Sequence, residues 1–449
     1  MATPTADAPA RPRGARRKRV LGDLDELRND PLALFARAAA SGEEVVRFRA
    51  VHRGVFLLPG PRAIAHVGIH NRDNYVKGVS YDALRVPLPN ALLTIDGEEA
   101  RERRRMLMPL FTRRSLLEEA PTIAAAVDAL SERWDRFAAS GEEIDVHHEM
   151  NRLTFDVVGR ILVGAETGPE MERLGARLDL ATAWVARRTR ALVPLPPGIP
   201  TPSNLAFRKV RRELSAWAVE LVESRRDGEQ SGAVGRMIAA ADDSPLGLGQ
   251  LCDEVTAFLM AGYQTTAAAL SWAWYLLARH PEVQERLAEA AKIALDREPP
   301  DPARVDVVPY IGQILDETMR LYPPGWAFTR TPLEDDEVAG HRIPAGAVVI
   351  VSSYANQHSP RLWEEPERFD PERFAPGRRE EIEPYAYFPF GVGPHACIGK
   401  HMAEIEARLA LALLARRYRI EAVSDAEVPA TPAITLTPSE PVRVRVARR

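Results

Sequence analysis

A ten-residue, glycine-rich turn at positions 390–399 constrains this chain more than any other stretch, because it carries one of only two cysteines. Gly391 and Gly393 allow backbone angles that a Cβ atom would forbid, so the turn can close tightly around the sulfur of Cys397. An apolar helical pattern follows over 402–413, and unpaired N–H groups at the start of a helix favour the thiolate. The turn therefore predicts a thiolate ligand for a metal; the alternative is a buried structural cysteine.

Two segments upstream of the cysteine carry charged residues that could pair with one another. Glu317 and Arg320 are three positions apart, which places them on one face of a helix. Alone, they would suggest an ordinary solvated ion pair. They lie about eighty residues before Cys397, and the segment 369–374 (Phe-Asp-Pro-Glu-Arg-Phe) lies between them and the cysteine.

A third feature lies inside an apolar helical stretch over about 251–277, where positions 261–266 read Ala-Gly-Tyr-Gln-Thr-Thr. Gly262 leaves room beside the helix and weakens it locally, where a bulge can open. Thr265 offers a hydroxyl that both donates and accepts hydrogen bonds. For the glycine alone, a close crossing of two helices is the competing explanation.

Taken together, these segments resemble the motifs F-x-x-G-x-x-x-C-x-G, E-x-x-R, F-x-P-E-R-F and A-G-x-[D/E]-T-[T/S] of the cytochromes P450. The resemblance covers the chain from about Val20. It implies a mainly α fold with small β-sheets (α+β), in which a long central helix lies over a haem and the cysteine loop lies on the proximal side. We expect one haem domain over 21–449 after a disordered basic tail over 1–20.

The resemblance also implies roles for single residues. Cys397 would be the axial thiolate of a haem b iron, and Gly262, Gln264 and Thr265 would form the oxygen-binding groove. The residues expected to contact the haem are Cys397, His395, Arg330, Arg104, Phe390 and Gly391. A buried structural triad is expected from Glu317, Arg320 and Arg373. The residues expected to line the substrate pocket are Leu88, Leu92, Phe258, Leu259, Ala261, Trp326, Ala327, Phe328 and Leu436.

Position 264 departs from the family pattern, because Gln264 stands where an acid is usual. An amide does not ionise, so the usual proton relay is in question. Three interpretations remain open: hydroxylation with water-mediated proton supply, which we favour; a substrate that supplies its own polar group; or a less usual reaction. The alternative function is an enzyme that uses peroxide or an activated N–O or O–O substrate. A haem-binding sensor or carrier without turnover is a further rival.

Local patterns predict the remaining organisation. Short apolar runs predict strands over 45–48 and 55–58, and alternation predicts strands over 434–436 and 442–446. Helices are expected from Asp96, over 115–192 and over 207–226. The segment 81–93 reads as a loop that, by resemblance, covers the substrate. The proline-rich segment 193–202 is not helical and resembles a lid connection or a rigid linker.

Composition constrains partners and location. The net charge of −4 argues neither for nor against nucleic acid, and the resemblance implies no such partner. Two cysteines are too few for a disulfide framework, which fits a reducing cytoplasm, and we expect a monomer. The sequence predicts neither a signal peptide nor a membrane anchor. No second cofactor motif is found, so we expect electrons from a separate ferredoxin and its reductase. The expected docking face consists of Arg103, Arg105, Lys400 and Arg408. The substrate is expected to be a hydrophobic natural product, such as a terpenoid, a polyketide-derived compound or an aromatic.

Overall fold

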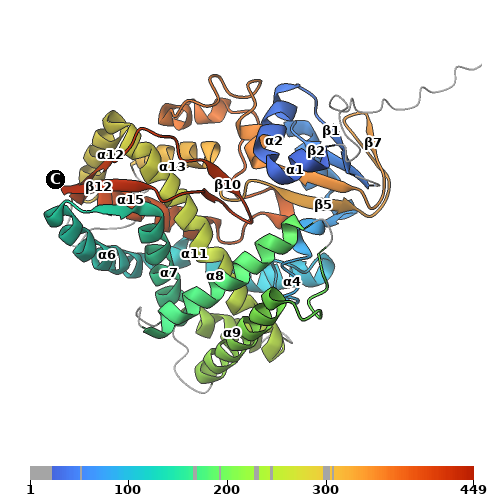
Figure 1. Ribbon diagram of the computed structural model, residues 1–449, viewed down its shortest axis with the longest axis horizontal. Helices are drawn as coiled ribbons and strands as arrows, with labels where there is room; N and C mark the ends of the chain where they lie inside the picture. Colours follow the sequence, from blue (N-terminus) through green and yellow to red (C-terminus); the bar gives the residue numbers. More distant parts are fainter. Residues whose placement is uncertain are drawn as a thin grey trace, which may run out of the picture. The chain divides into compact units, whose positions relative to one another are not determined.

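The computed structural model describes residues 23–50, 53–164, 169–191, 194–226, 232–242, 246–296, 304–305 and 308–449. The predicted tail over 1–20 lies outside these residues. The chain forms two compact units (Figure 1). The first consists of the residues up to Asp82, Trp326–Arg368 and Ile382–Ala396, and the second of Ala83–Gly325, Phe369–Glu381 and Cys397–Arg449. The single-domain boundaries proposed from the sequence stay a prediction.

The first unit is built on a sheet of five strands in the order β1-β2-β8-β5-β3. Phe56 and Leu58 pack into one apolar cluster, while Val55 and Leu57 pack into another, as the two-residue period of a strand requires. The strands predicted over 45–48 and 55–58 are confirmed. The strands of this unit are β1 Val46–Ala50, β2 Arg53–Leu58, β3 Tyr75–Lys77, β5 Phe328–Pro332, β6 Asp336–Val338, β7 His341–Ile343 and β8 Val348–Val351. Its helices are α1 Leu24–Asn29, α2 Pro31–Ala40, α3 Pro61–Ala65 and α14 Ser353–Gln357.

The second unit is mainly helical, and its longest helix is α11, Leu248–Arg279. Trp272 on α11 is fully buried, stacks on Tyr322 at 3.9 Å and donates from Nε1 to the Leu436 carbonyl at 3.1 Å. The other helices are α4 Gly97–Leu107, α5 Arg113–Leu117, α6 Ala120–Ser140, α7 Val146–Val163, α8 Pro169–Arg190, α9 Pro202–Arg226, α10 Gly232–Asp242, α12 Pro281–Ala294, α13 Pro309–Leu321 and α15 Lys400–Arg417. The predicted mainly α architecture with small sheets is confirmed.

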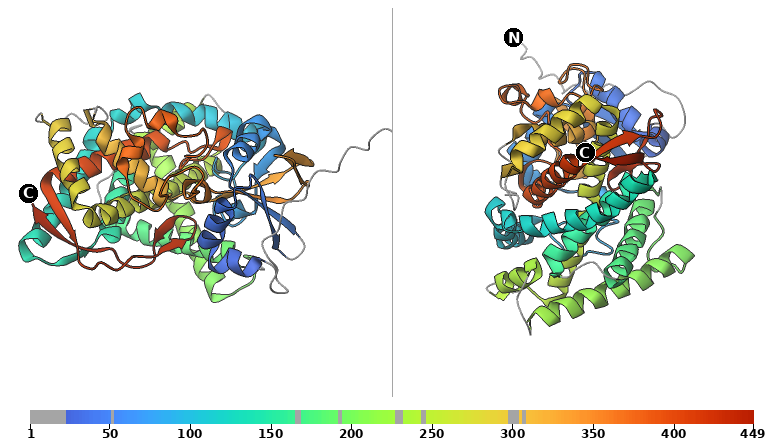
Figure 2. Two further views of the ribbon diagram at one scale, coloured as in Figure 1. Left: turned by 90° about the horizontal axis from the view of Figure 1, so that it is seen from above. Right: turned by 90° about the vertical axis from the view of Figure 1, so that its left-hand side faces the viewer.

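Two small sheets complete the second unit. Strand β12 (Arg443–Arg448) lies between β4 (Glu143–Asp145) and β9 (Tyr418–Ala422), and β10 (Ala430–Pro432) pairs with β11 (Leu436–Pro438). Figure 2 shows β12 at the C-terminal end of the chain. The strands predicted near the C-terminus are present, shifted by one or two residues toward the end of the chain. The strand β4 lies inside the stretch that the sequence predicted to be entirely helical.

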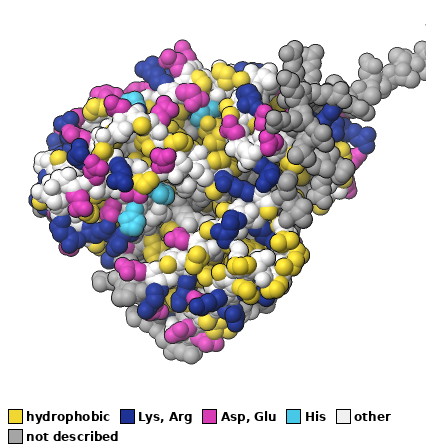
Figure 3. All heavy atoms as spheres, in the orientation of Figure 1, with side chains coloured by type: hydrophobic (Ala, Val, Ile, Leu, Met, Phe, Trp, Pro, Cys, Tyr) yellow, Lys and Arg dark blue, Asp and Glu magenta, His cyan; other side chains and the backbone are white. Residues whose placement is uncertain are grey.

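The connection between α8 and α9 is not helical from Pro194 to Thr201, as predicted, but Pro202 already begins α9. Val193 lies outside the described residues. Leu195 and Ile199 are exposed, yet the backbone of this turn is held by side chains of the flanking helices. Arg188 donates to the Leu195 carbonyl, and Arg208 donates to the carbonyls of Pro197 and Gly198. Hydrophobic side chains gather in Figure 3 over α9 and the connection before it.

Candidate active site

The cysteine turn adopts the backbone that its glycines predict. Gly391 and Gly393 have φ of +75° and +67°, in the left-handed region that favours glycine. A Cβ atom on Gly393 would lie 2.0 Å from the Gly68 carbonyl oxygen, so no other residue fits there without a shift of the backbone. Both glycines lie in the first unit, together with Phe390 and His395, which are partly buried.

Cys397 lies in the second unit, two residues before Gly399, the N-cap of α15. Its side chain is accessible, yet protein atoms crowd around the sulfur, and this burial raises the pKa of the thiol. The Gly399 N–H group donates to the sulfur, and the charge of Arg104 acts on it, and both lower the pKa of Cys397. Burial is the largest of these effects and raises the pKa of Cys397, while the backbone donor and the cation reduce that rise.

Arg104, on α4, is half-buried, and desolvation lowers the pKa of its guanidinium group. Arg330, in the first unit, is 5% exposed and donates to the Thr329 carbonyl at 3.0 Å and to the Tyr81 hydroxyl at 3.4 Å. Its guanidinium also lies 4.5 Å from the Phe328 ring centroid. Within the described part of the chain, neither arginine forms an ion pair with a carboxylate. Arg104 and Cys397, both in the second unit, fit a haem, because its propionates are carboxylates and its iron takes a thiolate.

The predicted triad is brought together in the second unit. Arg320 donates to both carboxylate oxygens of Glu317, at 2.6 and 2.8 Å, and both side chains are completely buried. Arg373 Nε lies 3.4 Å from Glu317 Oε1, and the Asp370 N–H group donates to the same oxygen at 2.9 Å. The network therefore ties α13 to the segment 369–374.

Helix α11 runs without interruption through the predicted groove, and the bulge that Gly262 would allow is not present in it. A Cβ atom on Gly262 would lie 3.1 Å from Val158 Cγ2 on α7, which is the close helix crossing that the sequence left as an alternative. Thr265 is partly buried, and its hydroxyl donates to the Ala261 carbonyl at 2.7 Å. The oxygen of Thr265 keeps its lone pairs as acceptors.

Gln264 belongs to a polar cluster that the sequence did not reveal. Its Nε2 donates to the Tyr263 hydroxyl at 2.8 Å and lies 3.3 Å from Asp179 Oδ1, on α8. The Tyr263 hydroxyl in turn donates to Asp179 Oδ1 at 2.5 Å, and burial raises the pKa of Tyr263. Asp179 thus places a carboxylate beside the position where the family has an acid. It is 85 residues away along the chain, and no local motif marks it.

The predicted pocket residues fall into two groups by burial. Leu88, Leu259 and Leu436 are completely covered by protein, so in this conformation they offer no surface to a substrate. The other residues retain exposed surface, and they are Leu92, Phe258, Ala261, Trp326, Ala327 and Phe328. Of these, Phe258 packs on Phe111 with ring centroids 5.0 Å apart.

Trp326, Ala327 and Phe328 belong to the first unit, where they pack against its apolar clusters. Trp326 lies 5.8 Å from Phe35 between ring centroids. These contacts hold the three side chains against the apolar core of the first unit.

One residue of the expected docking face, Arg103, is buried where the expectation needs it exposed. Arg103 is buried and donates to Glu254 Oε1 at 2.7 Å, so it is unavailable to a partner and the expectation for it is wrong. Its position on α4 directs Arg103 to α11. Of the other expected residues, Arg105 and Lys400 are exposed and Arg408 is partly buried. Burial raises the pKa of Glu254 to about 7, against the lowering effect of Arg103 and the Leu92 N–H group.

Comparison with known proteins supports the resemblance to the cytochromes P450. The family model of cytochrome P450 matches residues 12–446. The chain is 30% identical to pentalenene oxygenase of Streptomyces avermitilis, over 96% of each chain. It is 30% identical to cyclooctatin synthase of Streptomyces melanosporofaciens, over 91% of this chain and 89% of that one. A crystal structure of the cytochrome P450DA heme domain superposes with a TM-score of 0.88 at 24% identity, covering 99% of both chains.

The chain belongs to the cytochrome P450 family and is a monooxygenase with a haem iron cofactor ligated by a cysteine thiolate. In the part of the chain that the structure describes, no helix has both the length and the apolar character needed to cross a membrane.

Proposed function

We propose that this enzyme uses Cys397 as its haem ligand and inserts one oxygen atom of O2 into a hydrophobic small molecule, with electrons from a separate ferredoxin. The overall reaction converts R–H, O2, two electrons and two protons into R–OH and water. The observation that carries the proposal is the accessible Cys397 sulfur, supported by the Gly399 N–H group and the charge of Arg104. When bound, the haem iron supplies the oxidising chemistry.

The residues around α11 support a proton supply through this groove. Thr265 presents a hydroxyl oxygen with free lone pairs, and Asp179 brings an ionisable carboxylate to the side of Gln264. Asp179 is exposed to solvent, whereas Gln264 can only orient neighbours through its amide. We assign Gln264 to holding Asp179 and Tyr263 in place, with water carrying protons onward.

The substrate class follows from apolar lining and from relatives. Phe258, Leu92 and Ala261 offer apolar surface on the second unit. One relative is named for oxygenating pentalenene, and another is a cyclooctat-9-en-7-ol 5-monooxygenase, 31% identical over 90% of this chain. We infer hydroxylation of a hydrophobic natural product, with a terpenoid as the first class to screen.

The ligand assignment is tested with the two cysteines of the chain as a matched pair. The reduced wild-type protein with carbon monoxide should show the red-shifted Soret band of thiolate ligation. Cys397→Ser should lose that band, whereas Cys252→Ser should retain it, because Cys252 is a buried residue of α11. If Cys397→Ser kept the thiolate spectrum, the assignment of the ligand would fall.

A peroxide-dependent or activated-substrate reaction is the second candidate, and Gln264 is the observation that favours it. Its amide cannot release a proton, and it already donates to Tyr263. Product formation from peroxide without reductase, or from an activated substrate without O2, would establish this alternative. Dependence of product on both O2 and reductant would exclude it.

A further inference from the structure

The segment 88–94 is held on α11 by two adjacent carboxylates. The Asn90 N–H group and its side-chain Nδ2 both donate to Asp253 Oδ2, each at 3.0 Å. The Leu92 N–H group donates to Glu254 Oε1 at 2.7 Å. Backbone amides that donate to carboxylates form charge-assisted bonds, which are stronger than bonds between neutral groups.

Arg103 locks the same contact from the side of α4. Its Nη1 donates to Glu254 Oε1 at 2.7 Å and to the Asn90 carbonyl at 3.0 Å, and its Nη2 lies 3.3 Å from Glu99. Glu254 and Arg103 are both buried, so each would be costly to leave without the other. One buried ion pair therefore holds both α4 and the segment 88–94 against α11.

The segment 88–94 is also stiffened from within. Thr94 donates from its hydroxyl to the carbonyls of Leu88 and Ala91, at 2.5 and 3.0 Å, and Leu88 and Ala91 are completely buried. Arg85 Nε donates to the Thr94 carbonyl at 3.2 Å. A segment braced in this way moves as one piece, so contacts at Asn90 and Leu92 control the position of the whole segment.

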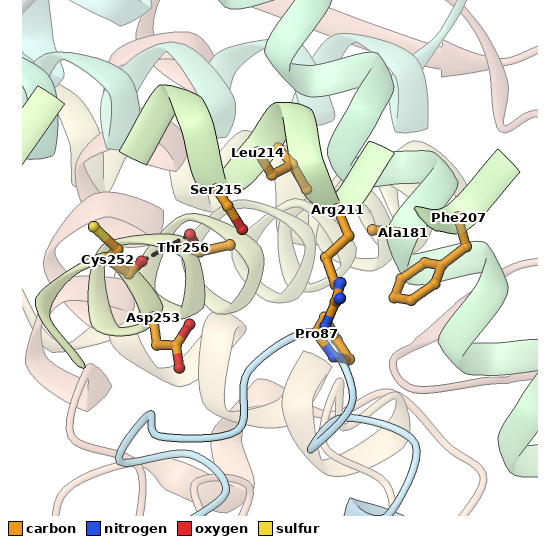
Figure 4. A pocket seen from close by; sticks show the side chains of 9 residues that line it. All are labelled: Pro87, Ala181, Phe207, Arg211, Leu214, Ser215, Cys252, Asp253 and Thr256. Carbon is orange, nitrogen blue, oxygen red and sulfur yellow. Dashed lines mark hydrogen bonds between the residues drawn. The ribbon is translucent and has the colours of Figure 1, made fainter. Parts of the chain in front are cut away.

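A small pocket lies beside this contact, at the seam where the loop containing Pro87 meets α9 and α11. Figure 4 shows Pro87 of the loop facing Arg211 of α9, with Asp253 of α11 directed toward the loop. Phe207 and Thr256 line the same pocket. Glu254 lies seven residues before Ala261 and eleven before Thr265, so these three residues share one face of α11.

We propose that Asp253 and Glu254 are positioning residues that hold the segment 88–94 over α11 and so limit how large a molecule passes this seam. The inference rests on the proposed function for its meaning, since the molecule admitted is the hydrophobic substrate. The carboxylates touch neither haem nor substrate in this role. Their effect acts through the backbone of Asn90 and Leu92.

Hydrogen–deuterium exchange in the full-length, haem-loaded protein tests the contact directly, because the two amides that donate to the carboxylates are the reporters. Asp253→Ala and Glu254→Gln should speed exchange in peptides covering 88–94 by about 10-fold, since each weakens bonds worth about a factor of ten. Asn90→Ala, at an exposed residue, should give a smaller increase without risk to folding. Exchange in α15 should not change.

The matched control is Glu149→Gln. Glu149 is buried like Glu254, pairs with Arg133 and accepts from Trp134 Nε1 at 3.2 Å, but it joins α7 to α6. This variant should leave exchange at 88–94 unchanged. If all three variants at the contact also left it unchanged, or if Glu149→Gln sped it equally, the positioning role would be overturned.

The size limit is tested by the rates at which two probes bind the haem iron, followed by the Soret band. The on-rate of 4-phenylimidazole should rise several-fold in Asp253→Ala and Glu254→Gln, while that of imidazole should stay within about 2-fold. Equal changes for both probes would overturn the proposal. Loss of the thiolate band with carbon monoxide in the wild type would instead refute the proposed function, and it would leave the exchange result standing.

Discussion

Gln264 Nε2 lies 2.8 Å from the Tyr263 hydroxyl, and this hydroxyl donates a hydrogen bond to Asp179 Oδ1 at 2.5 Å. Two neighbouring residues of α11 therefore direct their polar ends at one carboxylate of α8. The acid that is absent from position 264 is replaced in space, although not in sequence, by Asp179.

Restoring the acid with Gln264→Glu tests how protons arrive. The new carboxyl group would lie beside Asp179, and repulsion between like charges would raise its pKa, which suits a proton donor near neutral pH. We expect coupled oxygenation to be kept or raised. Asp179→Asn should lower coupling in the wild-type background and have less effect in Gln264→Glu. The measurement is product formed per NADPH consumed, with an identified substrate and a competent redox partner.

Thr265→Ala tests the hydroxyl of the groove. Because the bound oxygen would lose its hydrogen-bond partner, reducing equivalents should be diverted to peroxide, and coupled product formation should fall by about 10²–10⁴-fold. Thr266→Ala is the control, since Thr266 is buried and its hydroxyl bonds the Gly262 carbonyl at 3.2 Å. Full coupling in Thr265→Ala, together with an inactive Gln264→Glu, would favour the peroxide or activated-substrate reaction.

Removing one partner of the buried Glu317–Arg320 pair should strongly destabilise the protein. Glu317→Ala or Arg320→Ala leaves a buried charge uncompensated, at a cost of about 3–5 kcal/mol in the free energy of unfolding. The matched control is Glu289→Ala on α12, where an exposed pair with Lys292 has the same three-residue spacing at 2.6 Å. That exposed pair should contribute less than about 1 kcal/mol. Thermal unfolding and haem content of the three variants give the comparison, and equal costs would show that burial is irrelevant here.

Glu406 predicts a dependence of stability on pH. It is buried on α15, and neither of its carboxylate oxygens has a hydrogen-bond partner among the described residues, so burial raises its pKa well above the ordinary value. The folded state then keeps a proton that the unfolded state releases, and stability falls as pH rises above the unfolded pKa of about 4.3. Glu406→Met removes this loss.

The gain in unfolding free energy from Glu406→Met should be larger near pH 7.5 than near pH 4.5, by about 1 kcal/mol or more. Urea unfolding at the two pH values measures it. Glu404→Met on the same helix is the control, because Glu404 is partly exposed and lies near Lys400 and His401. A gain that does not change with pH would mean that Glu406 is not the protonated group.

Much of this fold was predictable because the decisive signals are local. The positive φ angles of Gly391 and Gly393 follow from their place in the cysteine turn, and the contact between Glu317 and Arg320 follows from the period of a helix. Spacing along the chain carried these predictions.

The remaining parts depend on contacts between distant segments. Arg103, Arg104 and Arg105 look alike in sequence, yet the turn of α4 buries the first against Glu254, 151 residues away, and leaves the third exposed. Asp179 was missed for the same reason. Which of three adjacent arginines meets a carboxylate is decided by the packing of α4 on α11, and no pattern within α4 encodes it.

The turn between α8 and α9 has a consequence for handling the protein. Protease cleavage needs a segment that unfolds locally into an extended strand, and exposure alone does not provide this. Arg208 occupies the carbonyls of Pro197 and Gly198, and Asn204 donates to the Pro196 and Ile199 carbonyls at 3.2 and 2.9 Å. The part of the turn from Pro196 to Ile199 should therefore resist nicking despite its exposed surface, and Arg208→Ala should turn it into a cleavage site.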